Sequence, residues 1–396
     1  MGITRRRFAQ GAAGALGIAL APRLVTPAIA ETDPIRIGWL GSVTGPLAAP
    51  GVGFQRGMRW AVEQHNADAK ARKIEVIERD TQGDPTKAVN ATQELISRQN
   101  VNAIWGPGNS GESLATTPIM ARQTMPNLHP CVVNSLIDTD KYPNAFRLAP
   151  SNIQWDDAVR NYTLKILKLT DVAILGDATG YGTSAVKDSV ASFKKDGANV
   201  VYQEVIDTNQ SGVTPNLLHA REAGAKALVI WSVTTGLNAR LMSARSAIGW
   251  KVPIIGHPAL GTGEVGKLVA APGDWEDVFC VGYRSCSYDP NGKLPPRMQE
   301  FMDRIQGKIE LSDSVLWWVA DAVDAVDLIA TAVTETGSTE HKAIIDWLNK
   351  QHAYPGLFGD YTFTPQEHNG YPTEEVVMSV ANTQRNGAYR LAPGYT

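Results

Sequence analysis

Residues 102–121, NAIWGPGNSGESLATTPIMA, place an apolar segment, a turn and a helical segment in direct succession. The apolar NAIW predicts a short buried strand, and the glycines and proline that follow it mark its end. From Gly111 onward the sequence predicts a helix. A strand that passes through a short glycine-rich turn into a helix is the repeating unit of a parallel α/β sheet.

The same unit recurs along most of the chain. Strands are predicted at residues 35–41, 73–80, 102–106, 171–177, 198–206, 225–231 and 252–256. Helices are predicted at residues 53–67, 84–99, 111–123, 152–169, 179–195, 213–222 and 234–248. The alternation restarts after FRLAPS, residues 146–151, so we expect two similar α/β lobes with this segment as a crossing between them. Valines spaced along residues 314–335 predict a long amphipathic helix, with Asp321, Asp324 and Asp327 off its apolar stripe.

The amino-acid composition limits the classes of protein to which the chain can belong. The chain has 396 residues, 43% of them hydrophobic and 19% charged, which is typical of a soluble protein with two domains. Its formal charge of −3 gives no reason to expect binding to nucleic acid or to an acidic membrane. Three cysteines without paired Cys/His spacing predict neither a metal site nor a cofactor. Cys280 and Cys286 could pair in an oxidising compartment, or all three cysteines could be free buried thiols.

The first thirty residues predict a signal peptide. TRRRF at residues 4–8 precedes an uncharged run rich in alanine and glycine, and Ala28 and Ala30 suit cleavage after Ala30. The arginine pattern is typical of twin-arginine export, with an ordinary secretory signal as the alternative. The apolar run is too short for a permanent anchor. Its removal takes away four arginines and no acidic residue, which lowers the formal charge from −3 to −7 and suits a freely diffusing, monomeric periplasmic protein.

Small polar residues lie where the predicted strand 102–106 ends. Ligands of an open parallel sheet bind beyond the carboxyl ends of its strands. Asn109, Ser110 and Gly111 are at such an end, where the next helix presents free N–H groups. These groups, the Ser110 hydroxyl and the close backbone approach at Gly111 predict a site for a small carboxylate. A plain helix cap is the alternative.

The ends of the strands in the second α/β series carry further candidate ligand-binding residues. Tyr181 follows the strand 171–177, Ser232 and Thr234 follow the strand 225–231, and His257 follows the strand 252–256. Their common position at one sheet edge favours a ligand-binding role over ordinary loop chemistry.

Two segments resemble motifs of nucleotide-binding proteins and of hydrolases, but each lacks a residue that its motif requires. GTGEVGKL, residues 261–268, ends in Leu268 where a phosphate loop needs a hydroxyl. GNSGE, residues 108–112, lacks the last glycine of a nucleophile elbow, and no histidine or acid is placed to activate Ser110. We therefore expect no enzyme, with an exported serine hydrolase as the weakest alternative.

Several segments together resemble the leucine/isoleucine/valine-binding proteins, which are the extracytoplasmic receptors of ABC importers. The resemblance spans nearly all of residues 33–390. It is carried by IRIGWLGSVTGPLAAPG, DTQGDPTKAVNATQELI, AIWGPGNSGESLATTPI, NAFRLAPSNIQ, GDATGYGTSAVKDSVASFKKDGANVV and LFGDYTFTPQEHNG, in this order.

The resemblance implies two doubly wound parallel-sheet lobes joined by three hinge crossings, the type I periplasmic binding protein fold. Lobe 1 would comprise residues 31–148 and 284–354, and lobe 2 residues 149–283 and 355–396. In the family, a serine that matches Ser110 and a segment that matches Val133 and Asn134 hold the ligand carboxylate. A tyrosine that matches Tyr181 closes over the ligand.

The chain departs from the family where its amino-acid binders carry acids for the ligand ammonium. His257 or Pro258 stands at one such position, and Gln154 and Trp155 stand near the other. A buried ammonium without a carboxylate partner is costly, so this departure favours a ligand without an α-amino group. Trp155 and His257 would then face the ligand from the second lobe.

The expected function is therefore that of a substrate-binding component of an ABC importer. It would bind a branched-chain amino acid or a related small carboxylate between two lobes and deliver it to a membrane permease. An aromatic acid or an amide as ligand, and a ligand sensor without a transporter, are the alternatives.

Overall fold

The computed structural model describes residues 33–45, 47–289, 291–311 and 314–395. From Pro34 onward these residues form one unit. The predicted signal peptide, residues 1–30, lies outside the described residues. Among the described residues, no helix is both long enough and apolar enough to cross a membrane.

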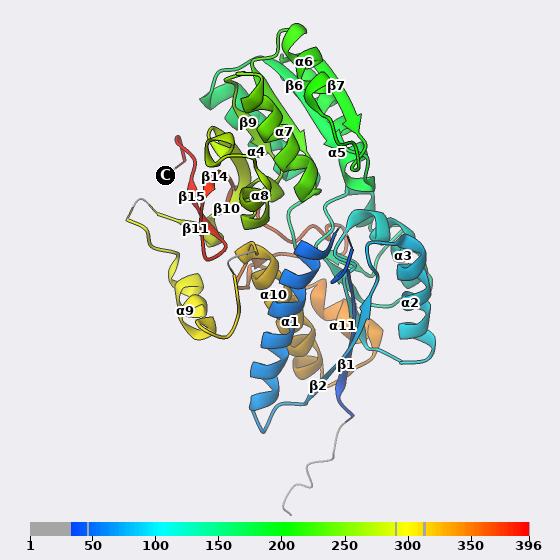
Figure 1. The fold of residues 1–396 in the computed structure, drawn as a ribbon. Helices are drawn as coiled ribbons and strands as arrows, with labels where there is room; N and C mark the ends of the chain where they lie inside the picture. The colour runs from blue at the N-terminus through cyan, green and yellow to red at the C-terminus, as the bar shows by residue number, and fades with distance from the viewer. Residues whose placement is uncertain (1–32, 46, 290, 312–313, 396) are drawn as a thin grey trace, which may run out of the picture. The chain divides into compact units, whose positions relative to one another are not determined.

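The first sheet has five parallel strands in the order β2-β1-β3-β4-β5. They are β1 (Ile35–Gly41), β2 (Ile74–Asp80), β3 (Ala103–Trp105), β4 (Asn127–His129) and β5 (Ala145–Arg147). The helices after the first three strands are α1 (Ala48–Ala67), α2 (Pro85–Ser97) and α3 (Ser110–Arg122). α2 and α3 cover one face and α1 the other (Figure 1). Covered faces explain why β1 is apolar except for Arg36, with Ile35, Ile37 and Trp39 buried.

The second sheet has eight strands in the order β11-β15-β14-β10-β9-β8-β6-β7. They are β6 (Asp171–Asp177), β7 (Asn199–Ile206), β8 (Ala227–Trp231), β9 (Ile254–Gly256), β10 (Val278–Tyr283), β11 (Ser287–Tyr288), β14 (Val376–Arg385) and β15 (Ala388–Leu391). β6 to β10 run parallel, whereas β14 is antiparallel to both β10 and β15. The doubly wound parallel fold predicted from the sequence is confirmed, and the tail extends this sheet with antiparallel strands.

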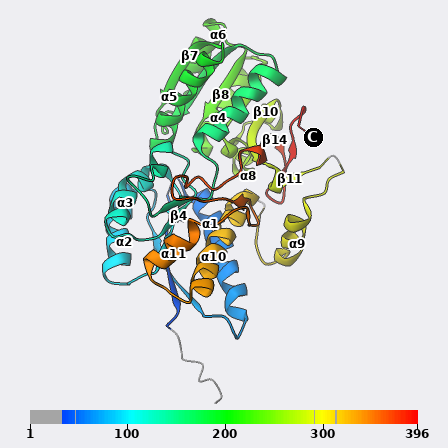
Figure 2. The ribbon, with the colours of Figure 1, turned by 180° about the vertical axis from the view of Figure 1, so that it is seen from behind.

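Helices cover both faces of the second sheet. They are α4 (Asn152–Asn161), α5 (Gly180–Lys195), α6 (Thr214–Glu222), α7 (Thr235–Ala247) and α8 (Gly263–Leu268). α4 and α5 lie toward the viewer in Figure 2, and α7 and α8 lie on the opposite face in Figure 1. α4 ends sooner than the predicted helix 152–169, because the chain continues as one π-helical turn, Tyr162–Ile166.

The remaining elements connect the two sheets. They are α9 (Pro296–Ile305), α10 (Leu316–Thr336), α11 (His341–Leu348), β12 (Tyr354–Pro355) and β13 (Asp360–Tyr361). Short 3₁₀ turns span Asn134–Ile137, Pro258–Gly261, Pro272–Trp275, Arg284–Cys286 and Thr373–Glu375. α10 packs along α1 beside the first sheet, after which the tail returns to the second sheet. The predicted lobe boundaries, residues 31–148 with 284–354 and residues 149–283 with 355–396, stay a prediction.

The long helix predicted over residues 314–335 is confirmed as α10, with Asp327 exposed, but it is buried over more of its surface than an amphipathic helix at the surface would be. Its apolar stripe is buried as expected, but so are Asp321 and Asp324 on its other side. The Asp324 carboxylate accepts hydrogen bonds from the backbone N–H groups of Leu357 (2.6 Å) and Phe358 (2.8 Å). α1 covers one side of α10 and the returning tail covers the other, so both aspartates are enclosed together with the apolar side chains, and burial raises the pKa of each.

Two of the connections between the sheets run side by side. The backbone N–H of Arg147 at the end of β5 donates to the carbonyl of His368 in the tail (2.9 Å), and the N–H of Gly370 donates to the carbonyl of Arg147 (3.1 Å). The Arg147 Nε donates to Asn369 Oδ1 (2.9 Å), and Asn369 Nδ2 donates to Gln154 Oε1 at the start of α4 (2.9 Å). These hydrogen bonds couple the first sheet, the tail and α4.

Candidate functional site

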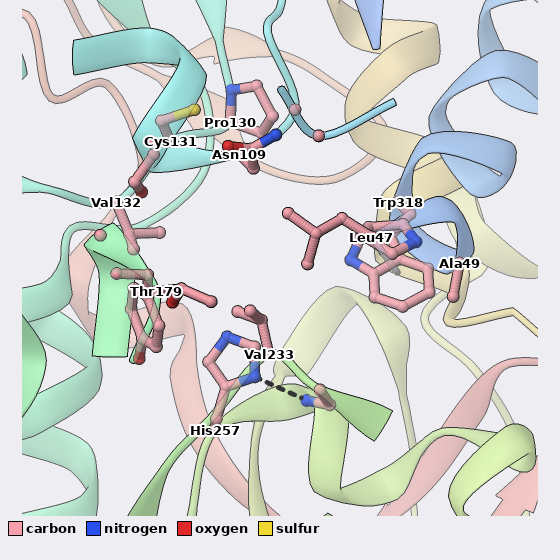
Figure 3. A pocket seen from close by; sticks show the side chains of 18 of the residues that line it. Leu47, Ala49, Asn109, Pro130, Cys131, Val132, Thr179, Val233, His257 and Trp318 are labelled. Carbon is pink, nitrogen blue, oxygen red and sulfur yellow. Dashed lines mark hydrogen bonds between the residues drawn. The ribbon is translucent and has the colours of Figure 1, made fainter. Parts of the chain in front are cut away.

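A cavity of about 250 Å³ lies at the carboxyl ends of the strands of both sheets. Its size suits a small molecule rather than a polymer. The following residues line it, several of which are labelled in Figure 3: Leu47, Ala49, Pro50, Phe54, Gly83, Pro85, Gly108, Asn109, Ser110, Gly111, Pro130, Cys131, Val132, Trp155, Thr179, Gly180, Tyr181, Val233, Thr235, His257, Ala259, Thr262, Trp317 and Trp318. Because parallel strands end at the same sheet edge, the loops after β1, β2, β3, β4, β6, β8 and β9 all contribute.

The N-terminus of α3 forms one side of the cavity. Asn109 has an extended backbone, and its Oδ1 accepts the N–H of Glu112 (3.0 Å), which caps the helix. Ser110 and Gly111 follow as the first helical residues, whose N–H groups have no acceptor within the helix. The Ser110 side chain is buried at 5% exposure, and no described residue hydrogen-bonds to its hydroxyl. This end of α3 therefore offers free donors and the positive end of a helix dipole.

The N-terminus of α5 meets that of α3. Thr179 caps α5, and its Oγ accepts the N–H of Gly182 (3.1 Å). A Cβ on Gly180 would lie only 3.4 Å from Gly111 Cα, so two glycines allow the two helix ends to approach closely. Thr235, the first residue of α7, lines the same cavity. Several helix N-termini thus converge on one space, and their dipoles favour a negatively charged guest there.

Three rings from segments that pack around the second sheet lie together beside these helix ends. The Trp155 ring on α4 lies 5.1 Å from the His257 ring, and the Tyr181 ring on α5 lies 4.9 Å from it, centroid to centroid. His257 Nδ1 accepts the backbone N–H of Ala259 at 3.0 Å, which is the dashed line in Figure 3. Burial lowers the pKa of His257 to about 3, so the ring is neutral at pH 7 and carries its proton on Nε2.

Two tryptophans on α10 also line the cavity, and they were not predicted from the sequence as site residues. The Trp317 ring lies 5.8 Å from that of Phe54 on α1 and 6.4 Å from that of Trp155, centroid to centroid. Trp318 lies beside Leu47 and Ala49 in Figure 3. Both come from a helix far along the chain, whose only available signal was a pair of adjacent tryptophans at its start.

No Asp, Glu, Lys or Arg is among the described residues that line the cavity. Asp177 lies behind the wall, where its Oδ2 accepts the N–H groups of Val233 (2.8 Å) and Thr234 (3.2 Å). Glu112 is buried one turn into α3, and its carboxylate accepts a hydrogen bond from the Asn109 side chain. Helix ends and neutral side chains therefore determine the electrostatics of the cavity.

Six of the ten predicted ligand-binding residues line the cavity: Asn109, Ser110, Gly111, Trp155, Tyr181 and His257. Four do not, namely Val133, Asn134, Ser232 and Thr234, although their neighbours Val132, Val233 and Thr235 do. The Val133 carbonyl accepts from Arg147 Nη1 (3.1 Å), and the Thr234 hydroxyl donates to Asp177 (3.0 Å). That any of these residues contacts a ligand stays a prediction.

The cysteines are buried free thiols, which is one of the two alternatives considered for Cys280 and Cys286. Cys131 lines the cavity and its thiol donates to the carbonyl of Pro107 (3.0 Å). Burial raises the pKa of Cys131 to about 12, so it is neither a thiolate nucleophile nor a charge in the cavity. The described residues contain no group of three or more His, Cys, Asp and Glu side chains that could hold a metal ion.

The chain is similar to known binding proteins in sequence. A family described as periplasmic binding protein matches residues 34–386. Leu/Ile/Val-binding protein homolog 7 of Brucella melitensis is 26% identical over 220 residues, which cover 53% of this chain and 55% of the relative. That match spans only about half the length of the relative. Leu/Ile/Val-binding protein homolog 3 of the same organism is 20% identical over 315 residues, 78% of this chain and 82% of the relative.

Solved structures share the fold. A periplasmic binding protein type 1 from Bordetella pertussis superposes with a TM-score of 0.80 at 22% identity, covering 91% of this chain and 100% of the other. The branched-chain amino acid transporter substrate-binding protein LivJ from Streptococcus pneumoniae, solved in complex with isoleucine, superposes with a TM-score of 0.74 at 20% identity, covering 91% and 99%.

The matched family is one of extracytoplasmic binding proteins rather than enzymes. Its match extends over the first sheet, over the second sheet except β15, and over every segment that lines the cavity. The chain therefore belongs to the periplasmic binding protein family, has the type I fold, and resembles the leucine/isoleucine/valine-binding proteins within that family.

Proposed function

We propose that this protein is the substrate-binding component of an ABC importer and that it binds a small carboxylate in the cavity between its two sheets. The observation that carries this proposal is the convergence of the N-termini of α3 and α5 on a cavity without a basic side chain among its described lining residues. Backbone N–H groups and helix dipoles can hold a carboxylate without a cation. The relatives named as Leu/Ile/Val-binding proteins support the importer assignment.

In this proposal the carboxylate lies between Ser110 and Gly111 on one side and Gly180 and Tyr181 on the other. The Ser110 hydroxyl donates to one carboxylate oxygen, and the first N–H groups of α3 donate to both. Trp155, Tyr181 and His257 face the rest of the ligand, and ligand release requires the two halves to separate by a hinge motion.

Residues 1–30 direct export in this proposal, by the twin-arginine route, with cleavage after Ala30. Expression of the full chain in a Gram-negative host tests it. The mature protein should appear in the periplasm and begin at Glu31, and replacement of Arg5 and Arg6 by lysine should keep the precursor in the cytoplasm. Normal export of that double variant would favour the ordinary secretory route.

A thermal-shift panel of amino acids, aromatic acids, aliphatic acids and amides tests ligand binding. A ligand present at 100 times its Kd adds about 2.7 kcal/mol to the free energy of unfolding, which is a readily measured shift in Tm. Ser110→Ala should then weaken the binding of any hit at least tenfold in calorimetry. Ser97→Ala serves as the control, because Ser97 is exposed at the end of α2 and only bonds back to Gln93. Unchanged affinity in Ser110→Ala would refute the carboxylate site.

A further inference from the structure

The charge of the cavity wall separates two classes of carboxylate ligand. An α-amino acid brings an ammonium group next to its carboxylate, and burial of that group requires a carboxylate or several hydrogen-bond acceptors. Among the described residues that line the cavity, none is acidic. The ammonium group would therefore lose its hydration and gain no ionic partner.

Two acidic side chains next to residues of the cavity wall, Asp177 and Asp84, are already engaged in hydrogen bonds. Asp177 accepts hydrogen bonds from Val233 and Thr234 through Oδ2 and from the Thr179 N–H (3.2 Å) and hydroxyl (2.5 Å) through Oδ1. Asp84 accepts the N–H groups of Thr86 and Lys87 at the start of α2. Neither carboxylate can turn toward a ligand without leaving several N–H groups unpaired.

Several polar side chains that face the cavity are able to donate hydrogen bonds to a ligand. The Ser110 hydroxyl has no described hydrogen-bond partner, and His257 is neutral with its proton on Nε2 because Nδ1 accepts from Ala259. No described residue hydrogen-bonds to His257 Nε2, which lies on the side of Thr179 and Val233 in Figure 3. The Thr262 hydroxyl already donates to the Ala259 carbonyl (3.2 Å). A ligand with hydrogen-bond acceptors therefore finds donors on this wall, and His257 Nε2 can act only as a donor.

The rest of the wall is apolar. Leu47 and Val132 approach the cavity from the first half of the chain and Val233 from the second, as Figure 3 shows. Phe54, Trp317 and Trp318 pack edge to face or tilted against one another beneath them, so the surface is broad and rigid. Such a wall suits the hydrocarbon or aromatic part of a ligand.

We propose that the ligand is an apolar or aromatic monocarboxylate without an ammonium group. This inference rests on the proposed carboxylate site and deepens it. The carboxylate lies at the N-termini of α3 and α5, the hydrocarbon part lies against the wall of Leu47, Val233 and Trp318, and His257 donates to an acceptor of the ligand.

Matched pairs of ligands test the inference with the mature protein. The pairs are leucine with 4-methylpentanoate and phenylalanine with 3-phenylpropanoate, and the neutral 3-phenylpropanamide is added to report on the carboxylate itself. We expect each acid without the amino group to bind at least tenfold more tightly than its amino-acid partner in calorimetry. Tighter binding of leucine or phenylalanine would overturn the inference but leave the carboxylate site intact.

Two other results distinguish the inference from the proposed function. Binding of 3-phenylpropanamide as tightly as 3-phenylpropanoate would refute the carboxylate site itself. Failure of all five compounds to bind at millimolar concentration would count against both, because the cavity would then accept neither class.

A variant of the chain tests the same point from the protein side. His257→Asp keeps an acceptor for the Ala259 N–H and adds a second carboxylate oxygen at the cavity. It should shift the ratio of Kd values for each pair at least tenfold toward the amino acid. His219→Asp on α6, away from the cavity, should leave the ratio unchanged, and His257→Asn should retain the preference for the acid. An unchanged ratio in a folded His257→Asp protein would overturn the inference.

Discussion

At the scale of single residues, Glu112 is a buried carboxyl group with a raised pKa, which no sequence pattern predicts. It is fully buried in the first turn of α3, next to the capping residue Asn109. Burial raises the pKa of Glu112 to about 7, against the smaller opposing effect of hydrogen bonds from Thr81 and Asn109. Asp80 and Asp84 on the neighbouring loop raise it further. A carboxyl group this close to the proposed anion site is thus kept partly neutral at pH 7.

The raised pKa predicts how stability depends on pH. The pKa of Glu112 in the folded protein lies above its ordinary value of 4.5, so the folded protein binds an additional proton between about pH 4.5 and 7. The free energy of unfolding therefore falls as pH rises through this window. Glu112→Gln removes this dependence, and relative to the wild type it should gain up to about 3 kcal/mol between pH 5 and 8. Chemical unfolding at several pH values measures the gain, and parallel pH profiles would contradict the prediction.

At the scale of elements, the crossing of α1 and α10 positions the aromatic wall. Two glycines one turn apart on α1 allow the close approach. A Cβ on Gly53 would lie 2.9 Å from Trp318 Cβ, and a Cβ on Gly57 would lie 2.1 Å from the Val319 carbonyl oxygen. Because Val319 follows the two tryptophans of the cavity, the helix separation at Gly57 also fixes where Trp317 and Trp318 lie.

The close approach predicts the effect of one added methyl group. Gly57→Ala forces a backbone oxygen away and should lower the free energy of unfolding by about 1–3 kcal/mol. Gly273→Ala is the matched control, because nothing lies within 4 Å of the Cβ it would add. Urea unfolding compares the two variants, with near-native midpoints expected for the control. Equal stability of both variants would show that the two helices can move apart freely.

At the scale of the whole molecule, the site depends on connections between the sheets. The cavity takes lining residues from the loops of both sheets and from α10, so no single half of the chain contains it. Arg147 and Asn369 join the end of β5 to the returning tail, and Gln154 joins that tail to α4, which carries Trp155. The relative placement of the cavity residues from the two sheets therefore depends on the hydrogen bonds among Arg147, Asn369 and Gln154.

These hydrogen bonds can be weakened without changing a residue that lines the cavity. Asn369→Ala removes the acceptor of Arg147 Nε and the donor to Gln154 Oε1. The buried guanidinium is left with fewer partners, so the free energy of unfolding should fall by about 1–3 kcal/mol. Hydrogen exchange should quicken in residues 145–151 and 368–371 together. Gln366→Ala changes an exposed side chain in the same tail segment and should leave exchange unchanged. Faster exchange in only one of the two segments would contradict their coupling.

The sequence by itself determined the alternation of strands and helices and several of the loops that line the cavity. These are local properties: the apolar runs of β1 and β6, the Asp84 cap followed by Pro85 at the start of α2, and the small residues Asn109–Gly111 after β3 all lie within a few residues of what they specify. Ser110 and Gly111, which these local properties predicted as ligand-binding residues, line the cavity.

Only the tertiary structure decided which distant segments meet. Trp317 and Trp318 reach the cavity because α10 packs on α1, and Asp321 and Asp324 are buried because the tail covers the other side of α10. Likewise, Val132 and Val233 line the cavity where Val133 and Thr234 were expected, since side-chain direction changes from one residue to the next. Such contacts depend on long-range packing, which the local spacing of apolar residues does not encode.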